Sequence, residues 1–255
     1  MNKKSIIIKF GGSVLTDKSK SENFLDNRIK SLIQTTSELV KRSIFEEVIL
    51  VHGAGSFGHP TAKKFNLDGD FRANTSEGIV KTLFGVRKLN QYLLEMCLQQ
   101  DLLVASVFLS NAGLGQINKL NFQKLVKELL SFGIIPLISG DILFSKNKKY
   151  RIVSGDEIVR ILVETMTLPT VIMVSDTKGV YDQDGKTINI LTEEIFEGLG
   201  QTITGATKVD MTGGMRQKIL ELFPIKTKAQ KIVICSWEDF EKVIYGDYTK
   251  STQII

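Results

Sequence analysis

Residues 5–13, Ser-Ile-Ile-Ile-Lys-Phe-Gly-Gly-Ser, join a short apolar run directly to a pair of glycines. An apolar run of this length that ends at glycine predicts a buried β-strand. The same arrangement recurs at residues 47–53, Glu-Val-Ile-Leu-Val-His-Gly, and at residues 134–140, Ile-Ile-Pro-Leu-Ile-Ser-Gly. Amphipathic stretches over residues 25–42 and 76–99 lie between these runs and predict helices. Strands that alternate with helices favour crossover connections, and therefore a mainly parallel sheet.

The rest of the chain continues this alternation. We expect further strands over residues 103–109, 170–175, 231–235 and 252–255, further helices over 121–130, 156–165, 212–225 and 237–244, and hairpins over 141–153 and 180–190. The predicted fold class is therefore α/β, an open and mainly parallel sheet sandwiched between helices in three layers. With 255 residues, the chain has room for one large domain or for two lobes on one continuous sheet. A soft boundary near Leu168-Pro169 gives lobes of residues 1–168 and 169–255.

Composition excludes several classes of protein. Hydrophobic residues make up 42% of the chain and charged residues 24%, which is ordinary for a globular protein and excludes a disordered chain, a collagen and a coiled coil. The net charge of +5 is mild, so it fits a solvated basic surface as well as an anionic ligand, and we expect no nucleic-acid partner. Two cysteines, Cys97 and Cys235, cannot form a disulfide framework and favour a reducing, cytoplasmic location. A helix needs about 20 apolar residues to cross a bilayer, and no apolar stretch approaches that length, so no membrane partner is expected.

Glycines cluster where the predicted strands end. Gly11 and Gly12 follow the first strand, and Gly53, Gly55 and Gly58 follow the second. Glycine lets backbone N–H groups approach an anion closely, although the same residues also serve simple tight turns. Neither cluster is a Walker A loop, because no Gly-Lys-Ser/Thr follows, and neither is a G-x-G-x-x-G dinucleotide motif.

Three lysines and one aspartate favour a site for phosphoryl transfer. Lys9 is the single charge in an apolar strand, so it needs an anionic partner, either a carboxylate such as Asp156 or a phosphate. Lys218 follows Gly213-Gly214 by one helical turn and could reach back over the helix N-terminus, although it and Lys18 could each be surface lysines. Phosphoryl transfer requires positioning and charge neutralisation, which such a set supplies.

The two histidines have different expected roles. His52 ends an apolar strand, which favours a packed, hydrogen-bonded core residue. His59 lies in the glycine turn just before Pro60, which favours an exposed donor to an anionic substrate. Two histidines without neighbouring acidic clusters make a poor zinc site, so no protein-held metal is expected. The absence of a G-x-S-x-G elbow disfavours hydrolase chemistry.

Together these motifs resemble the amino acid kinase superfamily and, more narrowly, its isopentenyl phosphate kinase branch. The resemblance spans nearly the whole chain, and the histidine after Ser-Phe-Gly is its most specific feature. It rests on Lys9-Phe-Gly-Gly-Ser13, His52-Gly-Ala-Gly-Ser-Phe-Gly-His-Pro60, Gly140-Asp141, Tyr150-Arg-Ile-Val-Ser-Gly-Asp156, Asp176-Thr-Lys-Gly-Val-Tyr181 and Asp210-Met-Thr-Gly-Gly-Met215, with Lys218 after it.

The resemblance implies a role for each matching position. ATP and Mg²⁺ would be the cofactors, isopentenyl phosphate the acceptor and a homodimer the assembly, with the acceptor in the N-terminal lobe and the nucleotide in the C-terminal lobe. The catalytic residues would be Lys9, Lys18, His59, Asp156 and Lys218. Those near the nucleotide would be Lys9, Gly11, Gly12, Ser13, Gly55, Asp176, Gly179, Gly214 and Lys218, and the acceptor site would include Ala54, His59 and Gly155. The helix over residues 76–99, with Leu83, Phe84 and Val86, is a candidate wall for the prenyl tail.

This sequence departs from the family pattern at a few positions. Ala54 replaces a usual glycine, Glu157 a common aspartate, and Thr177-Lys178 a Val-Asp pair. A fosfomycin-type or other small-phosphonate kinase on the same fold is an alternative. A non-catalytic ligand-binding protein is a second, and a carboxylate kinase, which would leave His59 without a role, is a third.

Overall fold

The computed structural model describes residues 4–17, 19–20, 22–111, 119–147, 149–201 and 213–255. Within these ranges an eight-stranded sheet has the order β3-β4-β2-β1-β7-β9-β10-β8, and β5 and β6 form a separate hairpin. Neighbouring strands of the large sheet are parallel except for β9 and β10. The strands are β1 (Ser5–Phe10), β2 (Glu47–His52), β3 (Val104–Val107), β4 (Ile135–Ser139), β5 (Asp141–Ser145), β6 (Lys149–Val153), β7 (Thr170–Ser175), β8 (Ile190–Leu191), β9 (Lys231–Ser236) and β10 (Ser251–Ile254).

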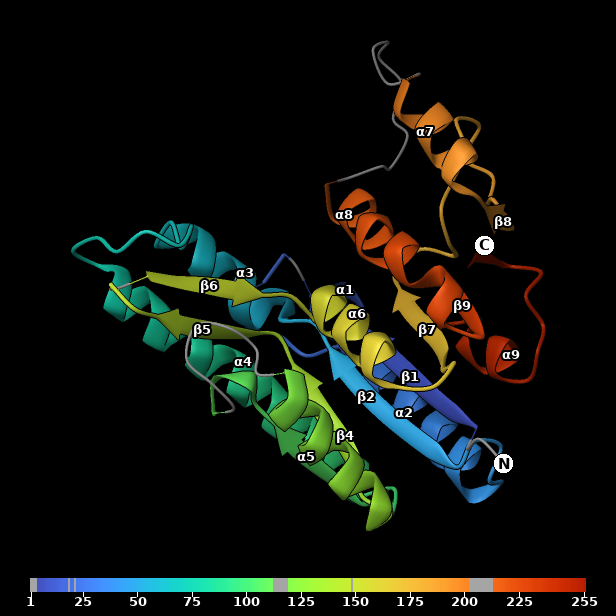
Figure 1. Ribbon diagram of the computed structural model, residues 1–255, viewed down its shortest axis with the longest axis horizontal. Helices are drawn as coiled ribbons and strands as arrows, with labels where there is room; N and C mark the ends of the chain where they lie inside the picture. The colour runs from blue at the N-terminus through green and yellow to red at the C-terminus, as the bar shows by residue number, and fades with distance from the viewer. Residues whose placement is uncertain (1–3, 18, 21, 112–118, 148, 202–212) are drawn as a thin grey trace.

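Helices cover both faces of this sheet (Figure 1). The apolar cluster on one face includes side chains of α5, α6 and α8, and the cluster on the other face includes side chains of α2, α4 and α9. The predicted three-layer α/β class is therefore confirmed. The helices are α1 (Gly12–Leu15), α2 (Asp26–Lys41), α3 (Gly55–Lys64), α4 (Thr75–Leu98), α5 (Lys119–Ser131), α6 (Gly155–Thr165), α7 (Glu193–Gln201), α8 (Gly213–Leu222) and α9 (Phe240–Ile244), with 3₁₀ turns at Leu109–Asn111 and Phe223–Lys228.

Strand β1 occupies the middle of the sheet because every one of its residues is buried. It pairs with β2 on one side and with β7 on the other, so the sheet runs without a break across residue 168. The division into two lobes at that residue stays a prediction. Side chains alternate along a strand, so Lys9 points to the same face as Ile7, the face that α6 covers.

The segment after β2 differs from its expected conformation. A glycine turn was expected there, and the prediction is wrong: residues Gly55–Lys64 form the helix α3, and His59 lies in its second turn. Gly55 has a φ of +51°, which turns the chain out of the strand and into the helix. Two further helices, α1 and α7, were not predicted, and the hairpin expected over residues 180–190 reduces to a single bridge between Tyr181 and Thr187.

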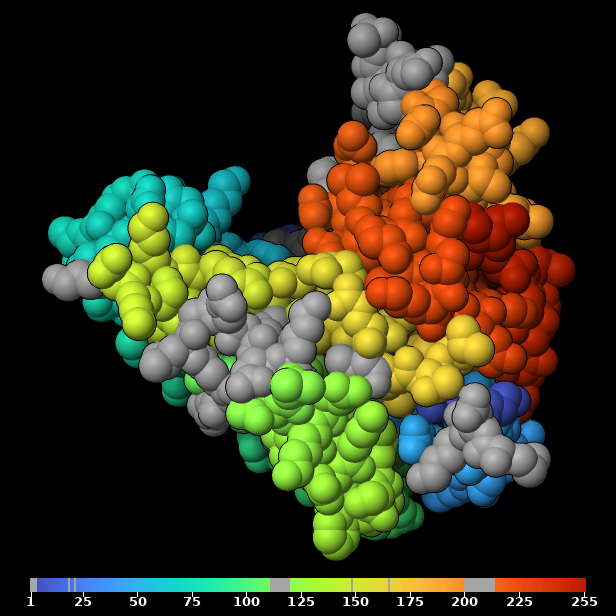
Figure 2. All heavy atoms as spheres, viewed as in Figure 1, coloured from blue at the N-terminus to red at the C-terminus, as the bar shows by residue number. Residues whose placement is uncertain are grey.

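A hollow separates two parts of the molecule (Figure 2). One wall is the arm made by α3, α4 and the β5–β6 hairpin, and the other is the part that carries α8. The floor between them lies at the carboxyl ends of β1 and β7, the edge where open α/β sheets bind their ligands. In the described residues, no helix is both long and apolar enough to span a membrane.

Candidate active site

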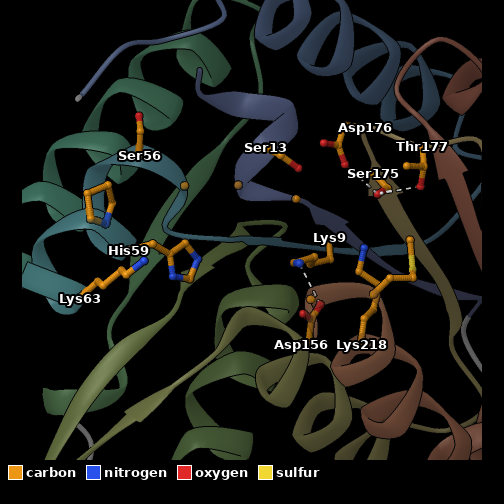
Figure 3. A pocket seen from close by; sticks show the side chains of 16 residues that line it. Lys9, Ser13, Ser56, His59, Lys63, Asp156, Ser175, Asp176, Thr177 and Lys218 are labelled. Carbon is orange, nitrogen blue, oxygen red and sulfur yellow. Dashed lines mark hydrogen bonds and ion pairs between the residues drawn. The ribbon is translucent and has the colours of Figure 1, made fainter. Parts of the chain in front are cut away.

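A cavity of about 620 Å³ opens at this edge of the sheet (Figure 3). It brings together the ends of β1 and β7 and residues of α1, α3, α6 and α8, each of which begins with a glycine. Its lining residues are Lys9, Gly11, Gly12, Ser13, Gly55, Ser56, His59, Pro60, Lys63, Asp156, Ser175, Asp176, Thr177, Gly214, Met215 and Lys218.

An ion pair between Lys9 and Asp156 lies at the centre of the cavity. The Lys9 Nζ atom is 2.8 Å from Asp156 Oδ1. Burial by itself raises the pKa of Asp156, but the charges of Lys9 and Lys218 outweigh it and hold that pKa below its usual value. Asp156 occupies the first turn of α6, where Ser154 Oγ caps the helix by accepting from the Glu157 N–H at 3.0 Å. Asp156 therefore stays ionised and fixes the position of Lys9.

Lys218 brings a second ammonium group to the same place from α8. Its residue is 8% exposed, and burial together with the charge of Lys9 lowers its pKa to about 8. Asp156 and Asp176 act in the opposite direction. Two buried ammonium groups thus lie beside the paired carboxylate of Asp156, and a polyanionic ligand bound against them would gain charge-assisted hydrogen bonds.

Two glycine loops meet backbone to backbone in the cavity floor. A Cβ atom on Gly12 would collide with the backbone nitrogen of Gly55, and a Cβ on Gly11 would lie 2.9 Å from the Val174 oxygen. Thr16 fastens the contact, because its hydroxyl donates to the Gly12 oxygen at 2.8 Å and accepts from the Ser56 N–H at 2.8 Å. The loop after β1 and the start of α3 thus form one continuous floor of backbone.

His59 faces the cavity from α3 (Figure 3). Its charge interaction with Asp156 contributes to the lowered pKa of that carboxyl group. Helix α3 begins directly after Ala54, and Gly58 packs its backbone against Ala54 and Val86, where a Cβ would lie 2.7 Å and 2.9 Å from their side chains. This close packing leaves the side of α3 that carries His59 turned toward Lys9.

Most of the expected site residues converge on this cavity. Three of them do not line it: Ala54 precedes α3, Gly155 lies behind Lys9 with a hypothetical Cβ 3.3 Å from Lys9 Cε, and Gly179 packs against Thr252. Lys18 lies outside the described residues. Glu157 turns away from the lysines and pairs with Arg151 at 2.8 Å. The expected residues that line the cavity are Lys9, Gly11, Gly12, Ser13, Gly55, His59, Asp156, Asp176, Gly214 and Lys218.

Sequence reasoning missed several residues of the lining, namely Ser56, Pro60, Lys63, Ser175, Thr177 and Met215. Lys63 follows His59 by four residues, which is a helical spacing. That signal was available, but it requires residues 55–64 to be a helix rather than a turn.

His52 is the buried core histidine that the sequence predicted. It is fully buried, and burial lowers its pKa to about 4. Its Nδ1 lies 3.0 Å from the Gly53 oxygen, which can only accept, so Nδ1 carries the proton. Its Nε2 then accepts from Asn90 Nδ2 at 3.0 Å, and Asn90 Oδ1 accepts from Ser106 Oγ. This chain of hydrogen bonds ties the strand end before Gly53 to α4 and β3.

The carboxylates of the cavity suit a magnesium ion that arrives with phosphate ligands. Mg²⁺ typically keeps several waters and takes one or two carboxylates together with substrate phosphates. Asp176 lines the cavity near Lys218, whereas Asp156 is engaged by Lys9. Among the described residues, no group of three or more His, Cys, Asp or Glu side chains could hold a metal by itself.

Comparison with known proteins places the chain in a family. The profile of the "Amino acid kinase family" matches residues 4–236. The isopentenyl phosphate kinase of Methanocaldococcus jannaschii is 30% identical over 84% of each chain, and that of Methanothermobacter thermautotrophicus is 27% identical over 98% of each chain. The crystal structure of an isopentenyl phosphate kinase substrate complex superposes with a TM-score of 0.80 at 21% identity, covering 98% of this chain and all of the other. The chain therefore belongs to the amino acid kinase family, where its named relatives are isopentenyl phosphate kinases.

Proposed function

We propose that this protein transfers the γ-phosphoryl group of ATP to isopentenyl phosphate, giving isopentenyl diphosphate and ADP. The observation that carries the proposal is the convergence of Lys9, Lys218 and His59 on one cavity whose floor is glycine backbone. The relatives named above, which match this chain over most of its length, carry the same activity in their names.

The donor would occupy the end of the cavity between β1 and α8. Phosphates of ATP would accept hydrogen bonds from the backbone at Gly12 and Gly214, and the ammonium groups of Lys9 and Lys218 would neutralise their charge. Gly11 would border them, because its own N–H already donates to the Val174 oxygen at 2.9 Å. Ser13 and Gly55 border the same space, and Asp176 and Gly179 would lie near the nucleotide.

The acceptor would occupy the end beside α3. His59 would donate a hydrogen bond to the phosphate of isopentenyl phosphate. The backbone at Ala54 and Gly155 would contribute from behind the lining residues Gly55 and Asp156. A non-bridging oxygen of that phosphate attacks the γ-phosphorus, the bond to the β,γ-bridging oxygen breaks, and ADP leaves with the electron pair. The attacking oxygen is already anionic, so the reaction needs no general base, and Asp156 serves to position Lys9.

Positive charge is what this reaction needs most, because two polyanions have to come together. Lys9 and Lys218 supply it from two elements, β1 and α8, and Lys18 is proposed to stabilise the transferring group. Mg²⁺ would enter with ATP, hold its phosphates in one geometry and take at most a carboxylate such as Asp176 from the protein.

An apolar cluster beyond His59 would receive the prenyl tail. It consists of Leu67, Ile79, Ile142 and Tyr150, with Leu83 packed against it, and it lies between α4 and the β5–β6 hairpin. Phe84 does not belong to this wall, because it is 68% exposed and lines a separate groove with Phe24 and Arg87. Val86 is buried against Gly58, so of the three expected wall residues we assign only Leu83 to the tail site.

The experiment that tests the function is an ADP-release assay with ATP and Mg²⁺ over three acceptors: isopentenyl phosphate, dimethylallyl phosphate and fosfomycin. We expect the highest kcat/KM with isopentenyl phosphate, and mass spectrometry should detect isopentenyl diphosphate. Preference for fosfomycin would assign the cavity to phosphonate chemistry, and ATP binding without ADP release on any acceptor would make the protein a non-catalytic binder.

A homodimer and a cytoplasmic location complete the proposal. Light scattering coupled to gel filtration tests the first, and fractionation of the source cells tests the second.

A further inference from the structure

We propose that Lys63 is a second binding residue for the acceptor phosphate, and that it makes the site selective for an acceptor that carries two negative charges. This inference deepens the proposed function and rests on it for the identity of the acceptor. Lys63 has no role in the mechanism proposed above.

Lys63 shares one face of α3 with His59. The two residues are four positions apart in the helix Gly55–Lys64, a spacing that stacks side chains on one side of a helix about 5–6 Å apart at Cβ. Both line the same cavity, and Figure 3 shows both side chains extending from α3 toward it. A phosphate that accepts a hydrogen bond from His59 therefore lies within the reach of the long Lys63 side chain.

The distribution of charge in the cavity leaves this task open. Lys9 is paired with Asp156 at the centre of the cavity, and Lys218 lies beside the same carboxylate and near Asp176, so neither lysine belongs to the end that α3 forms. A phosphomonoester has a second pKa of about 6 and carries nearly two negative charges at pH 7. His59 alone supplies at most one of the charges that such an acceptor needs, and Lys63 supplies another.

Lys63 is not held by a carboxylate in the described part of the chain. The ion pairs found there engage other lysines, such as Lys81 with Glu77 and Lys88 with Glu22. An exposed ammonium group at the rim of a cavity can swing onto an incoming phosphate without first breaking an ion pair. The charge is therefore available when the acceptor arrives.

The neighbouring residue offers a matched control. Lys64 has the same side chain, is also exposed and also lies in the last turn of α3, so both lysines favour the helix C-terminus. Lys64 does not line the cavity, and its Nζ lies 5.7 Å from the centre of the Phe65 ring. A purely structural role would make the two lysines equivalent, whereas a binding role makes them differ.

Titration calorimetry of isopentenyl phosphate into the protein with adenylyl imidodiphosphate tests the inference. The proteins are the wild type, Lys63→Met, Lys63→Arg and Lys64→Met. We expect Lys63→Met to weaken acceptor binding about tenfold, because it removes one charge-assisted hydrogen bond. Lys63→Arg should keep most of the affinity, Lys64→Met should stay within about twofold of the wild type, and every variant should bind the ATP analogue equally.

Kinetics and salt give two further readouts. In the ADP-release assay, Lys63→Met should raise the KM of the acceptor and leave kcat and the KM of ATP nearly unchanged, as expected for lost ground-state binding. The difference in acceptor affinity between Lys63→Met and the wild type should become smaller as the salt concentration increases, because salt screens an exposed charge.

Each result decides the matter. Equal affinities of Lys63→Met and Lys64→Met would overturn the inference, and so would a parallel loss of acceptor and ATP-analogue binding in Lys63→Met, which would indicate a structural defect. If the wild type binds isopentenyl phosphate through Lys63 but does not turn it over, the proposed function fails and the inference stands. If the wild type does not bind isopentenyl phosphate, both fail.

Discussion

Asp156 receives the ammonium group of Lys9 at 2.8 Å, with 18% of the aspartate side chain and 7% of the lysine side chain exposed. Each of these two largely buried charges compensates the other for the water it has lost. Removal of one leaves the other buried without a partner. The pair also lies between the two ends of the cavity, so its geometry affects both substrates.

Replacement of Asp156 by Asn should lower kcat about a hundredfold or more, because Lys9 loses the group that aligns it with the transferring phosphate. The same variant should unfold at a lower temperature. Glu157→Gln is the matched control, since it removes the adjacent charge from a pair with Arg151 that lies outside the cavity and is 44% exposed on the arginine side. Steady-state kinetics and thermal unfolding check both statements, and equal activities of the two variants would show that Asp156 does not organise the site.

His59→Ala should reduce kcat about a hundredfold, because the acceptor phosphate loses the donor that holds its attacking oxygen in line with the γ-phosphorus. The midpoint of thermal unfolding should change little, because the side chain faces a cavity rather than the core. His59→Asn restores a donor of similar reach and should recover part of the loss. Turnover of the alanine variant near the wild-type level would remove His59 from the mechanism.

Lys218 predicts an alkaline limit to activity. Its pKa is lowered to about 8 by burial and by Lys9, so the free enzyme loses this positive charge as the pH rises through about 8. The kcat/KM for ATP, which reports groups of the free enzyme, should therefore decline above this pH. Lys218→Arg keeps its charge throughout this range and should move the decline to higher pH. If the pH profile of kcat/KM is unchanged in that variant, the alkaline decline belongs to another group.

His52 predicts a loss of stability in mild acid. Its pKa is lowered from 6.5 to about 4. Between these two pH values His52 is protonated in the unfolded chain but stays neutral in the folded protein. Stability therefore falls as the pH drops from 6.5 toward 4, by up to about 1.4 kcal/mol per pH unit from this group. Urea unfolding of the wild type and His52→Gln at several pH values measures the difference. Parallel pH dependences of the two proteins would refute the assignment.

Asn90→Leu should destabilise the protein at neutral pH by about 1–3 kcal/mol, because His52 Nε2 would lose the donor that satisfies it inside the core. Chemical denaturation at pH 7 measures this effect. A variant as stable as the wild type would mean that the hydrogen-bond chain from β3 to Gly53 contributes nothing to the fold.

The central strands could be predicted to the residue, and the physical reason is burial. Strands β1, β2 and β7 have the bounds expected from sequence, because each is an apolar run that is buried over nearly its whole length and is followed at once by glycine or a polar residue. The expected partnership of Lys9 with a carboxylate followed from the same logic, since a charge in such a strand has to be compensated.

Helix α3 could not be predicted in this way. Its sequence holds Gly55, Gly58 and Pro60, which local preferences assign to turns. Packing decides otherwise, because α3 lies close against α4 where a side chain at Gly58 or Gly85 would collide with the opposite helix. The missed helix also explains why Lys63 escaped notice, since its relation to His59 depends on helical spacing.

The backbone contact between Gly12 and Gly55 has a mechanical consequence. Because these loops touch without intervening side chains and Thr16 bonds to both, the base of the donor site and the root of the helix that presents His59 move as one rigid body. Closure of the enzyme around its two substrates would then require the walls of the hollow to move, while the floor stays fixed. Replacement of either glycine by alanine should push the two loops apart and weaken the binding of both substrates.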